Sequence, residues 1–254
     1  MSSYLQKIGR IRAQLAAEGA AGAVLSTPDN IFYASGFSSV MDGWHLVEPI
    51  AAVFVPTDAA SPVVLIVPEA SVISPIVSER GGHPVHFDRL VTFDMLNFCE
   101  TARAEDAHLA LPADLLAELG DVMEQVEGQC EADIIHSIAA CLSRHVSKKE
   151  QILFDDLRVA ARVEALTGQA SGDALDAMFA ARAVKTADEL DTLRESGQIA
   201  DAIMAYTMSQ LDVGKSWSEV EKQVAHFMID HDVDPLPGSP MLFGGAYDLV
   251  FRPD

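Results

Sequence analysis

Near its N-terminus the chain reads Asn30-Ile31-Phe32-Tyr33-Ala34-Ser35-Gly36-Phe37. The cluster Thr27-Pro28-Asp29-Asn30, rich in turn-forming residues, predicts a turn where this stretch begins, and Gly36 predicts a break near its end. Just upstream, Ala23-Val24-Leu25 is typical of a short buried strand. Before that strand, apolar residues recur at helical spacing, namely Leu5, Ile8, Ile11 and Leu15. Gly19 stands where the C-cap of this helix is expected. We therefore predict a helix, a strand and a turn leading into residues 30–37.

Downstream of this stretch, strand and helix patterns alternate up to about residue 180. Strands are predicted at 50–56 and 63–67, joined by a hairpin at 57–62, with further candidates at 85–87 and 152–154. A helical pattern occupies residues 113–146. This alternation predicts an α/β layer structure over residues 1–180.

The C-terminal part of the chain has clear helix signals. Thr186-Ala187-Asp188-Glu189 has the form of a capping box, and an amphipathic pattern follows until Gly214. Ser216-Trp217-Ser218-Glu219 repeats the device at the start of a second helix. The Pro-rich segment 234–238 excludes a helix, and Met241-Leu242-Phe243 before two glycines predicts a strand that enters a turn.

Composition excludes several classes of function. The chain has 17 basic and 38 acidic side chains, and a formal net charge of −21 repels nucleic acid and anionic lipid. No segment approaches the ~20 apolar residues of a membrane span. The N-terminus lacks a secretory signal pattern, and three cysteines without Cys-x-x-Cys spacing indicate a reducing compartment. We therefore expect a cytoplasmic protein that binds neither nucleic acid nor membrane.

Three motifs in order resemble one known family. Residues 30–37 resemble its signature Asn-Ile-x-Tyr-x-(Ser/Thr)-Gly-Phe, and residues 182–190 resemble its linker, Arg-x-x-Lys-(Ser/Thr)-x-x-Glu. Gly214 and Glu219 fit an element, Gly-x-(Ser/Thr)-x-x-Glu, that starts a later helix. Together they resemble the creatinase/prolidase family, which also contains the Xaa-Pro peptidases.

The resemblance implies a fold, a reaction and a cofactor. We expect residues 1–180 to form a creatinase/prolidase-type N-terminal domain, a mixed sheet flanked by helices, and residues 181–254 to form the linker and first helices of a partial α+β pita-bread domain. Family members are usually homodimers that hydrolyse C–N bonds with two divalent metals, Mn, Co or Zn, although creatinase itself works without metal. The ligands, two Asp, one His and two Glu, would lie beyond Asp254. We therefore expect no catalytic residue and no metal ligand in this chain, and no activity from the chain alone.

Two places are candidates for substrate contact. In resembling enzymes the N-terminal domain overhangs the active site of the partner subunit, so the loop holding Trp44, His45 and Glu48 is a plausible contact; the alternative is simple packing of Trp44. Arg252 stands seven residues after Gly245, where resembling enzymes carry a substrate-binding His. A guanidinium there would suit a carboxylate; alternatively, this register is off or Arg252 faces solvent.

Other polar residues have structural interpretations. The set His226, Asp230, His231, Asp232 and Asp234 suggests a metal site, but His231 lies a further ~100° round the helix from His226 and Asp230, which favours a solvated helix end. Asp155-Asp156 could be paired carboxylates for general acid/base work. The pair follows a predicted strand, where Asp commonly starts a loop or caps a helix, and this structural interpretation is favoured. His83 and His86 need no function, and we expect Asn30 and Tyr33 to fix the turn and fill the core.

Two functions remain open. The first is a metal-dependent hydrolase acting on a small peptide or a small amide or amidine. The second is a non-catalytic dimerisation or binding module related to the creatinase N-terminal domain.

Overall fold

The computed structural model describes residues 3–39, 41–42, 48–95, 112–233, 243–244 and 249–250. The chain divides into two compact units, Met1–Thr186 and Ala187–Asp254. The boundary predicted between residues 180 and 181 falls within helix α7 (Leu175–Ala183), which packs against helix α1 (Ser3–Ala17) of the first unit.

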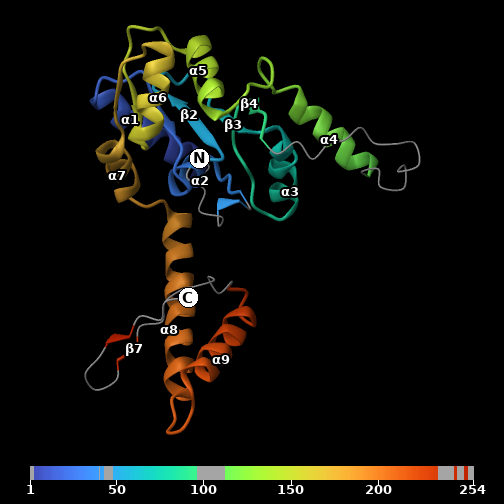
Figure 1. The fold of residues 1–254 in the computed structure, drawn as a ribbon, viewed down its shortest axis with the longest axis vertical. Coiled ribbons are helices and arrows are strands. Elements are labelled where there is room, and N and C mark those ends of the chain that lie inside the picture. The colour runs from blue at the N-terminus through green and yellow to red at the C-terminus, as the bar shows by residue number, and fades with distance from the viewer. Residues whose placement is uncertain are drawn as a thin grey trace. The chain divides into compact units, whose positions relative to one another are not determined.

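A mixed sheet forms the centre of the first unit (Figure 1). Within the described residues its six strands lie in the order β4-β3-β2-β1-β5-β6. The central β1–β2 and β2–β3 pairs are antiparallel, whereas β3–β4, β1–β5 and β5–β6 are parallel. The strands are β1 (Gly22–Leu25), β2 (Ala52–Pro56), β3 (Val64–Pro68), β4 (Arg89–Phe93), β5 (Ile152–Phe154) and β6 (Ser171–Asp173).

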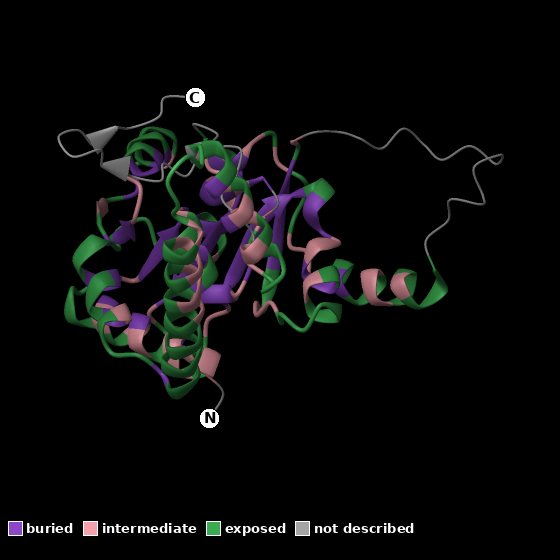
Figure 2. Cartoon of the chain, turned by 90° about the horizontal axis from the view of Figure 1, so that it is seen from below, coloured by how far each residue is buried: buried purple, intermediate pink, exposed green. Residues whose placement is uncertain are grey.

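Helices cover both faces of this sheet, which explains why its central strands are apolar without alternation. Side chains of one face, such as Leu25 and Val53, pack with α1, α2 (Pro28–Ser35), α3 (Ser74–Arg80), α4 (Ala113–Met123) and α7. Those of the other face, such as Val24 and Phe54, pack with α5 (Ile134–His145) and α6 (Leu157–Thr167). Figure 2 shows buried residues concentrated on the strands and on the helix sides that face them. The predicted α/β fold with a mixed sheet flanked by helices is confirmed.

Most predicted elements of the first unit are present, but residues 27–30 do not form an isolated turn. Thr27 is extended and Pro28 is the first residue of α2, which continues through Tyr33 to Ser35. Proline suits this position because the first helical N–H needs no partner. The helix ends at Gly36, whose left-handed φ of 76° lets its N–H bond to the carbonyl of Phe32. The turn prediction was therefore wrong, while the break at Gly36 is confirmed.

The predicted strand at 85–87 is also wrong. The β3–β4 ladder begins with Val64 opposite Arg89, just after these residues. The N–H of His86 bonds instead to the carbonyl of Ser35 at 2.7 Å, and Val85 and Phe87 pack on the core from a non-strand segment. An apolar alternation of three residues is too short to distinguish a strand from a packed loop.

In the second unit, the described residues form the helices α8 (Ala187–Gln210) and α9 (Trp217–Ile229). The capping box predicted at Ser216 is confirmed: its hydroxyl accepts from the N–H of Glu219, and that carboxylate accepts from the N–H of Ser216. The rings of Tyr206 and Phe227 stack at 4.2 Å. A short ribbon pairs β7 (Phe243–Gly244) with β8 (Leu249–Val250), and the rest of the strand predicted at 241–243 lies outside the described residues.

No helix in the described ranges combines the length and apolar character needed to cross a membrane.

Candidate functional site

The carboxyl ends of β1 and β5 meet because these strands are parallel neighbours. Asp155 follows β5, and Ser26 and Thr27 follow β1. Asp155 Oδ1 accepts from Ser26 N at 2.8 Å and from Ser26 Oγ at 3.2 Å. Its Oδ2 accepts from Thr27 N at 3.1 Å, Thr27 Oγ1 at 2.6 Å and Asn30 Nδ2 at 2.9 Å. One half-buried carboxylate therefore receives five hydrogen bonds from a single turn of the chain.

This carboxylate acts as the cap of α2. Thr27 makes no side-chain cap of its own, because its hydroxyl donates to Asp155. A negative charge beside the first residues of a helix is stabilised by the helix dipole and by free N–H groups. Asp155 therefore fixes the start of the helix that carries Asn30 and Tyr33.

The motif at residues 30–37 and the linker motif that begins at Arg182 are in direct contact, through Asn30. Arg182 Nη1 donates to Asn30 Oδ1 at 3.0 Å across 152 residues of sequence. The hydroxyl of Tyr33 donates to the carbonyl of Ala181 at 3.0 Å. Lys7 Nζ and Arg182 Cζ lie 5.4 Å and 6.0 Å from the centre of the Tyr33 ring, within the range of cation–π attraction. The expectation that Asn30 and Tyr33 have a structural role agrees with these contacts.

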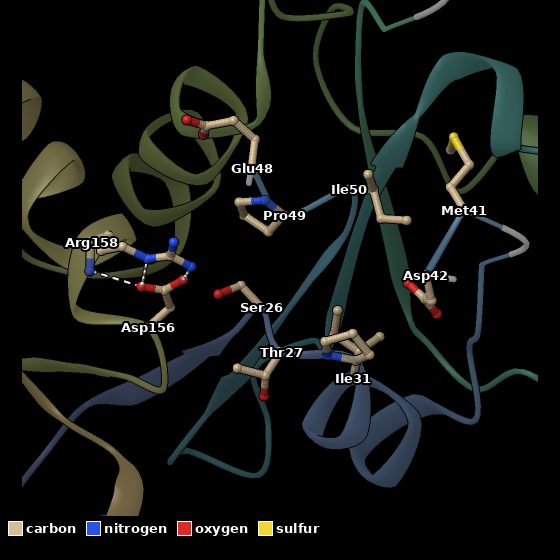
Figure 3. A pocket seen from close by; sticks show the side chains of 11 residues that line it. Ser26, Thr27, Ile31, Met41, Asp42, Glu48, Pro49, Ile50, Asp156 and Arg158 are labelled. Atoms are coloured by element: carbon tan, nitrogen blue, oxygen red, sulfur yellow. Dashed lines mark hydrogen bonds and ion pairs between the residues drawn. The ribbon is translucent and has the colours of Figure 1, made fainter. Parts of the chain in front are cut away.

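A pocket of about 230 Å³ lies beside this turn. Figure 3 shows Asp156 and Arg158 on one side of it and Met41 and Asp42 on the opposite side. The remaining lining residues are Ser26, Thr27, Pro28, Ile31, Glu48, Pro49 and Ile50. Open α/β sheets commonly bind ligands at the carboxyl ends of their strands, so this position is a candidate binding site.

The charged side of the pocket is internally paired. Arg158 Nη2 lies 2.7 Å from Asp156 Oδ2, and this hydrogen bond holds the pKa of Asp156 below its usual value. The other oxygen of Asp156 accepts from Arg158 N at 2.8 Å, which makes it the N-cap of α6. Glu48 is paired with Arg162. Asp156 is therefore a helix cap, as the sequence suggested.

The candidate substrate residues Trp44, His45 and Arg252 lie outside the described residues. Glu48, at the end of the same predicted loop as Trp44, is described and lines the pocket.

The side chains that suggested metal binding have other contacts. His231 Nδ1 lies 2.8 Å from the carbonyl oxygen of Phe227, and the two rings are 4.1 Å apart. Asp234 lies outside the described residues. Within the described ranges, no three His, Cys, Asp or Glu side chains come together in a way that could hold a metal ion. The described residues therefore do not fit the two-metal centre that the resemblance implies.

The remaining titratable groups are part of the packing. His86 stacks on Tyr4 with ring centres 4.3 Å apart, and burial lowers the pKa of His86 and raises that of Tyr4 to about 12. Cys141 is fully buried, which raises its thiol pKa; Cys130 is exposed, and Cys99 lies outside the described residues. We assign no catalytic role to any of these groups.

The sequence favoured Asp155 as a loop or cap residue over an acid/base role, placed Thr27 in a turn, and did not point to Ser26 or to the pocket. One available signal was that Ser26-Thr27 and Asp155-Asp156 each directly follow a buried apolar strand. That signal becomes informative only once β1 and β5 are known to be parallel neighbours.

Comparison with known proteins places the chain in a family. The sequence profile described as Creatinase/Prolidase N-terminal domain matches residues 7–196. No curated protein matches the chain in sequence.

Solved structures of similar fold extend this likeness beyond the first unit. A prolidase from Thermococcus sibiricus is 14% identical with a TM-score of 0.57, covering 91% of this chain and 51% of its own. The dipeptidase PepE from Mycobacterium ulcerans is 17% identical with a TM-score of 0.55, covering 90% and 49%. An Xaa-Pro dipeptidase from Bacillus anthracis is 15% identical with a TM-score of 0.54, covering 90% and 49%.

This chain thus spans about half the length of those proteins. The profile covers most of the sequence, and the mixed sheet agrees with it. By its N-terminal domain, the chain belongs to the creatinase/prolidase family.

Proposed function

We propose that the protein containing this chain hydrolyses a C–N bond in small peptides, with Xaa-Pro dipeptides as the first substrates to test. One observation carries the proposal: structures named prolidase or Xaa-Pro dipeptidase align with about nine-tenths of this chain, beyond the N-terminal domain alone. The substrate stays part of the proposal, since a shared fold does not determine a reaction.

The proposal assigns this chain a supporting role in the reaction. The first unit supplies a compact domain with a pocket beside Ser26 and Thr27. The loop containing Trp44 and His45 is proposed to contact substrate in a homodimer. Two divalent metals, Mn, Co or Zn, are proposed for the hydrolase. Because the described residues do not bring a set of metal ligands together, no chemical step is assigned to them.

Charge supports a small and soluble substrate. A net charge of −21 disfavours nucleic acid and anionic membranes as partners, whereas it does not exclude small peptides. Arg252 is proposed to hold a substrate carboxylate. A cytoplasmic location is part of the same proposal.

The test uses the longest natural form of the protein that contains this sequence. Its divalent metal content is measured, and it is assayed against Xaa-Pro dipeptides, dipeptides without proline, and small amides and amidines. We expect hydrolysis of a C–N bond that a chelator abolishes and Mn²⁺ or Co²⁺ restores. Absence of hydrolysis across the panel, with no stoichiometric metal, would favour the alternative of a non-catalytic dimerisation or binding module.

The role of Arg252 has its own control. Arg252→Ala is compared with Arg194→Ala, which removes a surface arginine paired with Asp191 at 2.7 Å. We expect only the first variant to raise KM for substrates with a free carboxylate. Equal kinetics in both variants would remove the assignment of Arg252. Light scattering of the same samples tests the proposed homodimer.

A further inference from the structure

We propose that Arg182 and Asn30 form a latch that holds the end of the first unit in place. The latched part, called here the exit segment, is Ala181–Thr186, the last residues of that unit. In this proposal the latch sets the point at which the chain leaves the first unit, independently of any catalytic activity.

At the centre of the latch, hydrogen bonds join three side chains in series: an acceptor, an amide and a donor. The Asp155 carboxylate can only accept hydrogen bonds, and the Arg182 guanidinium can only donate them. Asn30 lies between them and satisfies both, because its Nδ2 donates to Asp155 at 2.9 Å and its Oδ1 accepts from Arg182 at 3.0 Å. Asn30 is only 9% exposed, so neither end of its amide has ready access to water as a substitute.

This arrangement explains why an amide is needed at position 30. An aspartate there would turn a second carboxylate towards Asp155 and lose the donor. An apolar residue would leave both charged neighbours without their shared partner, which is costly for partly buried groups. The amide therefore connects the capped start of α2 with Arg182 in α7.

Further side chains hold the exit segment at the C-terminal end of α7, where carbonyl groups lack helical partners. The hydroxyl of Tyr33 donates to the carbonyl of Ala181 at 3.0 Å, and the guanidinium of Arg10 donates to the carbonyl of Val184. At the end of the segment, the hydroxyls of Ser3 and Thr186 lie 3.1 Å apart. All three side chains come from α1 or α2, so two N-terminal helices hold a segment more than 140 residues away in sequence.

Hydrogen exchange on the full chain tests the latch. The expected result for Arg182→Ala is exchange about tenfold or more faster at the amides of residues 180–183, the last turn of α7, as expected when local hydrogen bonds open. Amides of β1 and β5 should keep their protection, because the latch acts locally. Arg158→Ala is the matched control, since the hydrogen bonds of that exposed guanidinium go to Asp156 and not to the exit segment.

Two further variants separate a latch from a general loss of stability. Arg182→Lys keeps a cationic donor and should restore part of the protection. If Arg182 acts through Asn30, adding Arg182→Ala to Asn30→Ala should cause little further change in exchange at residues 180–183. Trypsin cleavage after the exposed Lys185 should become faster in Arg182→Ala.

Two results would overturn the proposal. One is protection of the amides of residues 180–183 in Arg182→Ala that equals that of Arg158→Ala. The other is a loss of protection that is uniform over the exit segment and the sheet, which would make Arg182 an ordinary stabilising residue.

Discussion

Replacing Asp155 by asparagine should destabilise the first unit far more than the same change at Asp156. Asp155 Oδ1 accepts from the N–H and hydroxyl of Ser26, and Oδ2 accepts from the N–H and hydroxyl of Thr27 and from the Asn30 amide. In Asp155→Asn one of these oxygens becomes an NH₂ group, which cannot accept. Whichever way the new amide turns, a backbone N–H at the start of α2 faces a donor.

The magnitude follows from the groups left without an acceptor. A buried donor that loses its partner costs about 1–3 kcal/mol, and here at least one N–H and one hydroxyl are affected. The hydroxyl can rotate towards another acceptor whereas the N–H cannot, so we expect a loss of about 2–4 kcal/mol in the free energy of unfolding. For a unit of this size that corresponds to a fall of roughly 5–15 °C in Tm.

The assay is urea unfolding followed by far-UV circular dichroism at pH 7, supported by thermal melts. Asp156→Asn is the control: Asp156 caps α6 through Arg158 N, a role that asparagine fills equally well, and its ion-pair partner Arg158 is 72% exposed, so water can replace that contact of the guanidinium. The control should therefore unfold near the wild-type midpoint. Equal midpoints for the two variants would refute the view that Asp155 organises the start of α2.

Three other predictions concern separate parts of the first unit. Gly36→Ala should lower stability by about 1–2 kcal/mol or more, because φ is 76° and an added Cβ would lie 2.7 Å from the carbonyl oxygen of Pro84; urea unfolding measures this. Burial raises the pKa of Tyr4 from 10.0 to about 12, so its contribution to stability is complete below pH 10 and is lost as pH rises through 12. Tyr4→Phe should therefore lose less stability than wild type between pH 10 and 12. If the urea midpoints of the two proteins fall equally with pH over that range, the raised pKa of Tyr4 is contradicted. Ile138→Ala, at a site with 0% exposure, should cost about 2–5 kcal/mol. Leu116→Ala, at a site with 50% exposure, should leave the thermal midpoint nearly unchanged.

Local pattern was sufficient for much of the fold. The apolar run at 23–25 and the Leu5–Leu15 spacing correspond to β1 and α1, and the capping box at Ser216 starts α9. These predictions depend on residues within a few positions of one another, where sequence spacing translates directly into a helix or a strand. The motif at residues 30–37 also predicted the family, which the profile match confirms.

Where local pattern was ambiguous, packing decided the outcome. Thr27-Pro28-Asp29-Asn30 has the composition of a turn, yet it starts a helix because Asp155 supplies the cap from another part of the chain. Residues 85–87 alternate like a strand, but the ladder with β3 begins only at Arg89. In both cases the deciding hydrogen-bond partner lies outside the window in which spacing is informative.

The sequence by itself determined most of the segments that form helices and strands, apart from residues 27–30 and 85–87, and which family they resemble. Only the tertiary structure decided that β1 and β5 are parallel neighbours, and so that Asp155 meets Ser26 and that Asn30 joins Asp155 to Arg182. The physical reason is distance along the chain. These contacts join residues 125 or more positions apart, and hydrogen bonds of that range depend on strand order, which spacing along the sequence does not encode.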